Sequence, residues 1–194
     1  QIVAQWHAAR YDLHTAIDNI VFMGMGEPMD NIEVVIQAIR VLSDRNAAAI
    51  SPARISVSTA GHVKGMARLG DLVREHGFHQ VRLAVSLNAP NDEIRSSLMP
   101  INRSASMSRL MEVMRAWPGS VRCPIMIEYV LIPGVNDAVE HASEICRYLE
   151  PLHCILNLIP YNPRRHSPWN APSEAAIQAF HAAAAGTGQL VRRR

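Results

Sequence analysis

The chain has 194 residues, of which 48% are hydrophobic and 19% charged, and its formal net charge at pH 7 is +2. This length and apolar content suffice for one domain with a buried core and exclude an intrinsically disordered chain. Three irregularly spaced cysteines exclude a disulfide framework and indicate reduced, mostly buried thiols. No apolar run approaches the roughly 20 residues of a membrane span, and the first residues lack a signal-peptide pattern. We therefore expect a cytoplasmic protein without a membrane partner.

Short apolar runs alternate along the chain with longer segments in which apolar residues recur at helical spacing. In chain order, we expect a helix at 2–9, a strand at 20–23, a helix at 32–42, a strand at 54–58, a helix at 63–75, a strand at 81–86, a helix at 107–117, a strand at 125–131, a helix at 139–149, a strand at 155–159, a helix at 173–185 and a last strand at 189–193. The strand at 20–23 is apolar throughout, which predicts burial on both faces. Asp30 and Asn31 are expected to cap the helix that follows them.

Strands and helices that alternate at this pitch indicate right-handed βαβ units around a parallel sheet. A complete eightfold barrel typically needs about 250 residues, so a barrel of this length must be partial. The alternation fits both an open α/β barrel and a doubly wound sheet. No linker, repeat or low-complexity segment divides the chain, which indicates one domain over residues 1–194.

In parallel α/β folds, ligands bind at the carboxyl ends of the strands. The segment Gly24 to Pro28 follows the first expected strand and is the most specific candidate. Its two glycines let the backbone approach a ligand, and Glu27 supplies a carboxylate suited to an ammonium group. A dinucleotide-binding fingerprint is excluded, because Met29 stands where that motif requires glycine. The alternative is a tight turn with an exposed glutamate.

Polar residues also follow the other expected strands. Ser58 and Ser86 place hydroxyl groups where they could bond a carboxylate or a ribose, or cap the next helix. Asn162 has an amide suited to an adenine edge, although Asn before proline is also an ordinary turn signal. The basic clusters at 164–165 and 192–194 form either a phosphate-contacting surface or a solvated rim and tail.

Several classes of chemistry lack their motifs. The nine histidines form neither a His-x-His nor a His-Glu-x-x-His arrangement, which argues against a zinc site. The nucleophile elbow of hydrolases and the phosphate-binding Gly-Lys-Ser/Thr loop are also absent. A metal-independent lyase with Glu27 as its base would need an acid partner, and the sequence indicates none.

Taken in order, a series of strings resembles the RlmN/Cfr family over nearly the whole chain. These strings are FMGMGEP (22–28), SVSTAG (56–61), LAVSLNAPNDEIR (83–95), PIN (100–102), GVND (134–137), EHA (140–142) and NLIPYNP (157–163). The string at 90–95 and the Glu27-Pro28 pair look more like the RlmN branch than the Cfr branch.

The resemblance implies a partial (β/α)6 barrel of the radical S-adenosylmethionine (SAM) class. Residues 1–194 would be a truncated core domain of this class, with the first strand missing. Family members methylate C2 of an adenine in large-subunit ribosomal RNA and, in RlmN, also in transfer RNA. A 4Fe–4S cluster reduces SAM to a deoxyadenosyl radical, and a methylated cysteine delivers its carbon to the adenine. The intact family member is expected to be a monomer.

The resemblance also assigns cofactor-binding roles to matching positions. These positions are Gly26, Glu27, Ser58, Ser86, Leu87, Asn88 and Asn162. Gly26 and Glu27 would hold the amino group of SAM, and Asn162 its adenine. Ser58 and the segment 86–88 would hold the ribose and the methionine portion.

The chain also departs from the family pattern. The Cys-x-x-x-Cys-x-x-Cys motif that holds the cluster would lie upstream of Gln1 in this register, and the acceptor cysteine beyond Arg194. Scattered cysteines cannot replace the three thiolates that leave one iron open for SAM. Position 88 is usually His in the family. The Asn88 side chain can still form hydrogen bonds, but unlike histidine it cannot gain or lose a proton near neutral pH. We therefore expect the central part of an RlmN-like methyltransferase, inactive as this chain, or alternatively a non-catalytic SAM- or RNA-binding remnant.

Overall fold

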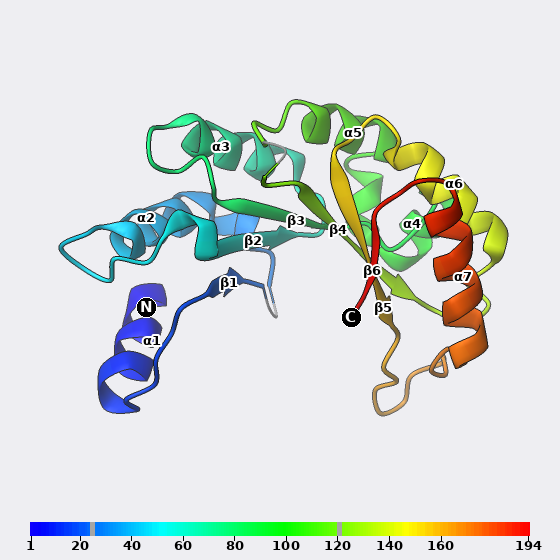
Figure 1. The fold of residues 1–194 in the computed structure, drawn as a ribbon, viewed down its shortest axis with the longest axis horizontal. Helices are drawn as coiled ribbons and strands as arrows, with labels where there is room; N and C mark the ends of the chain where they lie inside the picture. The colour runs from blue at the N-terminus through cyan, green and yellow to red at the C-terminus, as the bar shows by residue number, and fades with distance from the viewer. Residues whose placement is uncertain (24–25, 120–121) are drawn as a thin grey trace.

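The computed structural model describes residues 1–23, 26–119 and 122–194. Within these ranges, six strands form one sheet in the order β1-β2-β3-β4-β5-β6, and every pair is parallel (Figure 1). The strands are β1 (Ile20–Phe22), β2 (Ile55–Thr59), β3 (Arg82–Ser86), β4 (Ile125–Leu131), β5 (Cys154–Pro160) and β6 (Val191–Arg193). Each strand pairs with its neighbours in sequence, so the order never reverses as it does in a doubly wound sheet. The sheet curves into an arch without closing, which confirms the partial α/β barrel.

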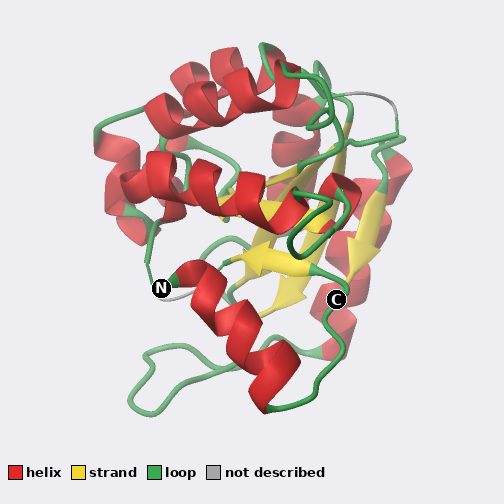
Figure 2. Ribbon diagram, turned by 90° about the vertical axis from the view of Figure 1, so that its left-hand side faces the viewer, coloured by secondary structure: helices red, strands yellow, loops and turns green. Residues whose placement is uncertain are grey.

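Helices cover the convex face of the arch (Figure 1). The helices are α1 (Ile2–His7), α2 (Ile32–Ser43), α3 (Val63–Arg74), α4 (Asp92–Leu98), α5 (Met107–Arg115), α6 (Val139–Leu149) and α7 (Glu174–Gly186). Figure 2 shows α1 beneath the sheet at its β1 edge, where it borders α2. Among the described residues, no helix is both long and apolar enough to cross a membrane.

The two faces of the sheet differ in chemistry because successive side chains on a strand point to opposite faces. The buried core between strands and helices includes Ile55, Val57, Leu83, Val85, Ile127, Tyr129, Leu156 and Leu158. The residues between them, such as Ser58, Ser86, Glu128 and Asn157, face the hollow under the arch. The convex face therefore holds the fold together, and the concave face is left for polar side chains.

Two local expectations near the amino terminus are wrong. The strand β1 is not buried on both faces, because Val21 is 55% exposed at this edge of the sheet. Asn31 stands at the N-cap position of α2 but its side chain makes no capping hydrogen bond, and the turn before α2 is capped by Glu27. Its Oε1 accepts a hydrogen bond from the Met29 N–H at 3.0 Å, and a 3-10 turn then leads directly into α2.

Helix α4 was not expected from the sequence. It has only seven residues, and its one buried residue is Arg95, so it lacks the apolar periodicity on which helix prediction depends. Asn91 caps it, because the Asn91 Oδ1 accepts a hydrogen bond from the Ile94 N–H at 3.0 Å. The short helix carries Arg95 underneath the loops that follow β2 and β3.

Candidate functional site

The sequence-predicted site residues lie along the carboxyl ends of the strands, as a parallel sheet requires. Gly26 and Glu27 follow β1, Ser58 is near the end of β2, and Ser86 ends β3. Asn162 follows β5. Residues 24–25 of the loop after β1 lie outside the described residues, so the site is built from position 26 onward.

Glu27 connects the first two strand ends. One carboxylate oxygen, Oε2, accepts a hydrogen bond from the Ala60 N–H at 2.8 Å in the loop after β2, while Oε1 caps the turn at Met29. Together with Gly26 and Pro28, Glu27 lines a cavity of ≈ 680 Å³ whose other walls come from α1, β1 and α2. A carboxylate oxygen can accept more than one hydrogen bond, so both oxygens remain open to a ligand donor.

Ser58 and Ser86 carry hydroxyl groups that have no hydrogen-bond partner in the described part of the chain. Ser58 is only 6% exposed. Neither serine caps the next helix: the His62 Nδ1 accepts from Gly65 at the start of α3, and Asn91 caps α4. The helix-capping alternative is therefore wrong for both serines, and their hydroxyls are available on the concave side.

Leu87 and Asn88 continue from β3 with their polar groups engaged. The Leu87 N–H donates to the Glu128 carbonyl at 3.0 Å, and the Leu87 side chain is fully buried. Asn88 has a left-handed backbone with φ of 57°, which Asn tolerates better than most residues. Its Oδ1 accepts from the Val130 N–H at 2.9 Å, so this side chain extends the pairing between β3 and β4. The segment is thereby held rigid beside Ser86.

Arg95 is a residue of the site that the sequence did not indicate. It is 1% exposed, and its guanidinium donates to three acceptors from separate segments. The Nη2 reaches the Ala60 carbonyl at 2.5 Å, the Nε reaches the Leu87 carbonyl at 3.2 Å, and the Nη1 reaches the Asn102 Oδ1 at 2.7 Å. Ala60 also binds Glu27, so Arg95 and Glu27 together tie three strand-end loops into one unit.

Asn162 is the second residue of the long loop between β5 and α7. It is exposed, and its amide has no hydrogen-bond partner among the described residues. The neighbouring Tyr161 anchors the loop: its N–H donates to the Leu131 carbonyl at 3.1 Å, and its hydroxyl lies 2.7 Å from the Ser167 Oγ. The Tyr161 ring also meets Trp169 edge-to-face at 5.7 Å. This anchoring leaves the Asn162 side chain free to contact a ligand.

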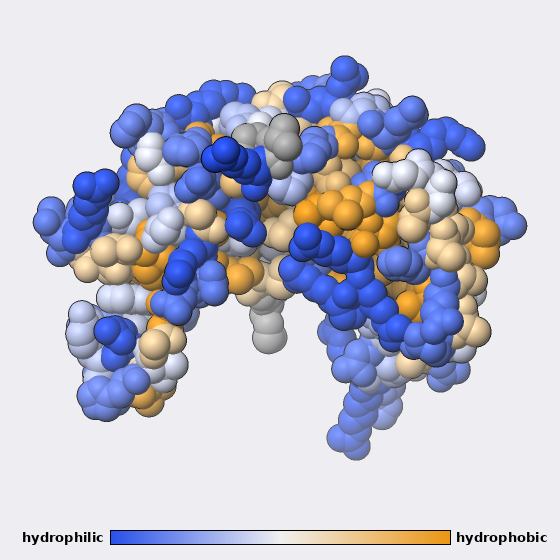
Figure 3. Space-filling model, viewed as in Figure 1, coloured by the Kyte–Doolittle hydropathy of each residue, from blue (hydrophilic) through white to orange (hydrophobic). Residues whose placement is uncertain are grey.

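The two basic clusters lie near one corner of the arch, because β6 pairs with β5 and the loop after β5 carries the other cluster. Figure 3 shows hydrophilic side chains on the right-hand side of the hollow and on the leg below it. Two arginines at the end of the chain are paired: the Arg193 Nη2 bonds Glu174 at 2.8 Å, and the Arg194 Nη1 lies 3.8 Å from the Glu128 Oε1. In the described part of the chain, the arginines without an ion-pair partner near this corner are Arg164, Arg165 and Arg192.

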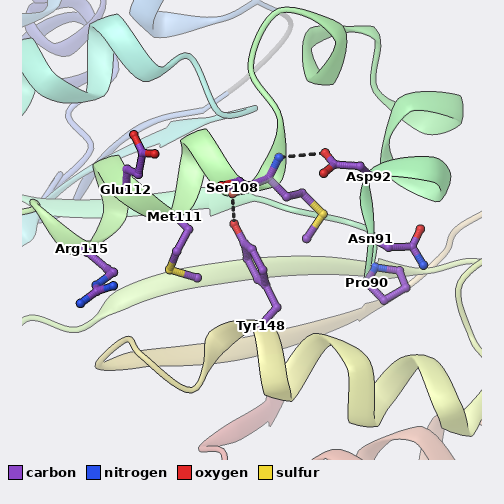
Figure 4. Close-up of a pocket in the computed structure, with 9 residues that line it drawn as sticks. Pro90, Asn91, Asp92, Ser108, Met111, Glu112, Arg115 and Tyr148 are labelled. Atoms are coloured by element: carbon purple, nitrogen blue, oxygen red, sulfur yellow. Dashed lines mark hydrogen bonds between the residues drawn. The ribbon is translucent and has the colours of Figure 1, made fainter.

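A second cavity, of ≈ 700 Å³, opens on the convex side beside α5 and α6 (Figure 4). The Tyr148 hydroxyl donates to the Met107 carbonyl at 2.7 Å, and the Asp92 Oδ1 accepts from the Met107 N–H at 2.8 Å. Burial raises the pKa of Tyr148, so its phenol stays protonated as a donor. These polar groups satisfy one another, and none of the predicted site residues lines this cavity.

Comparison with known proteins identifies the family. Residues 8–146 match the Radical SAM superfamily. The chain belongs to the radical SAM superfamily. Within this superfamily it is RlmN-like. It is 45% identical over 161 residues to a "Dual-specificity RNA methyltransferase RlmN" of Campylobacter lari, covering 82% of this chain and 44% of the relative. It is 42% identical over 181 residues to the protein of that name from Geobacter sulfurreducens, covering 93% and 48%.

Solved structures agree with this placement. A radical SAM methyltransferase from Sphaerobacter thermophilus superimposes with a TM-score of 0.89 at 39% identity, over 100% of this chain and 56% of the other. A domain of pyruvate-formate lyase-activating enzyme from Bacteroides vulgatus shares the fold alone, with a TM-score of 0.66 at 18% identity, over 92% of this chain and 99% of that one. The chain spans about half the length of the curated relatives that it matches.

Radical SAM proteins use SAM and a 4Fe–4S cluster, and the described residues fit these two groups differently. The cysteines of this chain are dispersed: the Cys146 Sγ faces the Ala184 carbonyl at 3.7 Å, and the Cys154 Sγ accepts from Gln189 at 3.7 Å. No group of three or more metal-ligating side chains occurs among the residues that the structure describes. These cysteines therefore do not form a cluster site. A carboxylate and two partnerless hydroxyls at the strand ends, in contrast, suit the polar groups of SAM.

The chemistry of these thiols can be tested by alkylation. Burial raises the pKa of Cys154 to about 11 and also raises the pKa of Cys146. At pH 8, a thiol with a pKa of about 11 is ionised in about one molecule in a thousand, and only the thiolate reacts. We expect iodoacetamide to label Cys154 at least about a hundredfold more slowly in the folded chain than in urea, as followed by peptide mass spectrometry. Labelling of folded Cys154 at the unfolded rate would contradict this burial.

Proposed function

We propose that these residues form the SAM-binding centre of an RlmN-like methyltransferase that modifies C2 of an adenine in large-subunit ribosomal RNA and in transfer RNA. The observation that carries the proposal is that the Glu27 carboxylate and the partnerless hydroxyls of Ser58 and Ser86 lie at the carboxyl ends of three neighbouring strands of a partial barrel. Relatives named as dual-specificity RNA methyltransferases support the reaction class.

Each site residue takes a role that suits its geometry. The Glu27 carboxylate, held by two backbone N–H groups, accepts from the ammonium group of SAM beside Gly26. Ser58 and the segment 86–88 hold the ribose and the methionine portion, with the backbone of that segment fixed by β4 and Arg95. The exposed amide of Asn162 bonds the adenine edge. SAM supplies the methyl group, and this chain binds and orients it.

The RNA partner is assigned to the arginines at the corner of the arch. Arg164, Arg165 and Arg192 are exposed and unpaired within the described residues, so they can neutralise phosphates without breaking an ion pair. In this proposal the protein works as a monomer in the cytoplasm. The 194 residues alone bind SAM without methylating RNA, because their dispersed cysteines do not hold the cluster.

Calorimetry of SAM binding to the purified chain tests the pocket. We expect Glu27→Ala to weaken binding about tenfold to a hundredfold, since a hydrogen bond between charged partners contributes about 1.5–3 kcal/mol. Asn162→Ala should weaken binding less, because it removes neutral hydrogen bonds. The exposed Glu150→Ala serves as the matched control and should leave the affinity unchanged. Absence of binding, or binding indifferent to both site substitutions, would overturn the assignment.

A non-catalytic SAM- or RNA-binding module is the second candidate, and the dispersed cysteines favour it. A module that binds SAM predicts the same affinities as the enzyme, so the pocket variants do not separate these two. The flanking reading frame does: continuation upstream into a Cys-x-x-x-Cys-x-x-Cys motif supports the enzyme. Stop codons on both sides would support the module.

A further inference from the structure

A row of polar side chains crosses the concave face of the sheet at one level. Ser86, Glu128, Asn157 and Arg192 are Cα partners on β3, β4, β5 and β6, so their side chains lie side by side on the same face. Glu128 is only 4% exposed and Asn157 only 2%. The cofactor roles assigned above use Ser86 and leave Glu128 and Asn157 without a function.

The hydrogen bonds of this pair are incomplete. The Asn157 Nδ2 donates to the Glu128 Oε1 at 3.2 Å, and the Arg194 Nη1 lies 3.8 Å from the same oxygen. Within the described residues, the Glu128 Oε2 and the Asn157 Oδ1 have no hydrogen-bond partner. Both side chains are mostly shielded from water, and polar groups in such places usually find hydrogen-bond partners. The concave face therefore presents two adjacent acceptors that lack donors.

The free atoms restrict the ligand group. Both are acceptors, so the ligand must donate hydrogen bonds. A phosphate would be repelled by the carboxylate of Glu128, and a cationic group would meet Arg192 and Arg194 in the same corner. A ribose diol commonly takes both oxygens of one carboxylate, whereas the two free acceptors here belong to different side chains, Glu128 and Asn157. A neutral amino group fits both acceptors, because its two N–H donors can point to Glu128 and Asn157 on neighbouring strands, which lie about 5 Å apart.

We propose that Glu128 and Asn157 form a subsite that binds the exocyclic amino group of an adenine. This inference rests on the proposed function, since an adenine is present in both ligands of that function, the RNA and SAM. Arg194, 56% exposed at its side chain, lies at the solvent side of the row, with its Nη1 3.8 Å from the Glu128 Oε1. The subsite would distinguish adenine from bases that carry a carbonyl oxygen at the same position. Such an oxygen is itself an acceptor, so it cannot form hydrogen bonds with the acceptors of Glu128 and Asn157.

The test compares two probes that differ only in the amino group. One RNA stem-loop carries a single unpaired adenosine, and a second carries purine riboside, which lacks the amino group, at that position. We expect wild-type chain to bind the adenosine stem-loop more tightly. Glu128→Gln, which keeps the volume but replaces an acceptor with a donor, should weaken that binding about tenfold and leave purine stem-loop binding unchanged. Asn157→Ala should act in the same direction, and the exposed Glu140→Gln should change neither.

Calorimetry with SAM forms the second arm and identifies the source of the adenine. A loss that appears only with RNA assigns the subsite to the substrate base, and a loss that appears only with SAM assigns it to the cofactor. Equal affinity of the wild-type chain for both stem-loops together with unchanged SAM binding in both variants would overturn the subsite. Failure of Glu27→Ala to affect SAM binding would overturn the proposed pocket instead. Circular dichroism of each variant checks that the fold is retained.

Discussion

Replacing Arg95 with leucine is expected to lower the free energy of unfolding by about 3 kcal/mol or more. The guanidinium is 1% exposed and donates to Ala60, Leu87 and Asn102. Leucine fills part of the volume but leaves these buried acceptors without donors, and each unsatisfied group costs about 1–3 kcal/mol. Burial lowers the pKa of Arg95, and the nearby Tyr148 and Asp92 side chains partly oppose this effect.

Urea unfolding followed by circular dichroism measures this effect. Arg95→Lys should recover part of the lost unfolding free energy. Its ammonium group can reach some of the three acceptors, but it lacks the planar guanidinium that reaches all of them at once. The exposed Arg115→Leu is the matched control and should change stability by less than about 0.5 kcal/mol. An Arg95→Leu chain as stable as the control would show that the observed hydrogen bonds contribute little.

Arg95→Lys, the variant in which the fold survives, should also weaken SAM binding. Arg95 bonds the Ala60 carbonyl, and the Ala60 N–H bonds the carboxylate of Glu27. If the Ala60 backbone shifts when Arg95 is replaced, the Glu27 carboxylate moves with it, although Arg95 does not contact Glu27. Arg95 acts as a positioning residue, and its effect on affinity should disappear when Glu27 is already replaced by alanine. A double-mutant cycle of the two sites measures that coupling.

The order of the elements could be predicted from the sequence because their signals are local. Apolar periodicity placed β4 at Ile125–Leu131 and α6 at Val139–Leu149 with the bounds that the structure shows. Helix α4 escaped prediction because it buries a single arginine instead of an apolar stripe. The exposure of β1 could not be predicted either, since an apolar run does not reveal whether its strand lies in the centre of a sheet or at its edge.

The strand-end positions of Glu27, Ser58 and Ser86 followed from parallel topology alone. The contacts of Arg95 could not be predicted, because its acceptor at Ala60 lies 35 residues away in sequence. Glu128 did leave a signal that was overlooked. It is a charged residue in the middle of an otherwise apolar strand, and such a residue needs a partner or a function.

The second large effect is expected at Asn136, which is fully buried in the turn after β4. Its Oδ1 accepts from the Ile132 N–H at 2.7 Å, and its Nδ2 donates to the carbonyls of Asn88 and Val130 at 2.7 and 2.8 Å. All of its polar atoms are thus engaged, and the turn is fixed against the segment after β3. Asn136→Asp keeps the shape but turns a donor into an acceptor that faces two carbonyl oxygens.

At pH 7, Asn136→Asp should destabilise the chain by about 4 kcal/mol or more, because it buries an unpaired charge beside two acceptors. A carboxyl group in this position binds a proton more tightly in the folded state than in the unfolded state. Its destabilisation is therefore smallest below the unfolded pKa of about 4 and grows as the pH rises. Urea unfolding of both chains between pH 4 and pH 7 should show the gap to wild type widening. The exposed Asn170→Asp should show no such trend, and a pH-independent gap at Asn136 would mean that the carboxylate finds water or a donor that the turn does not supply.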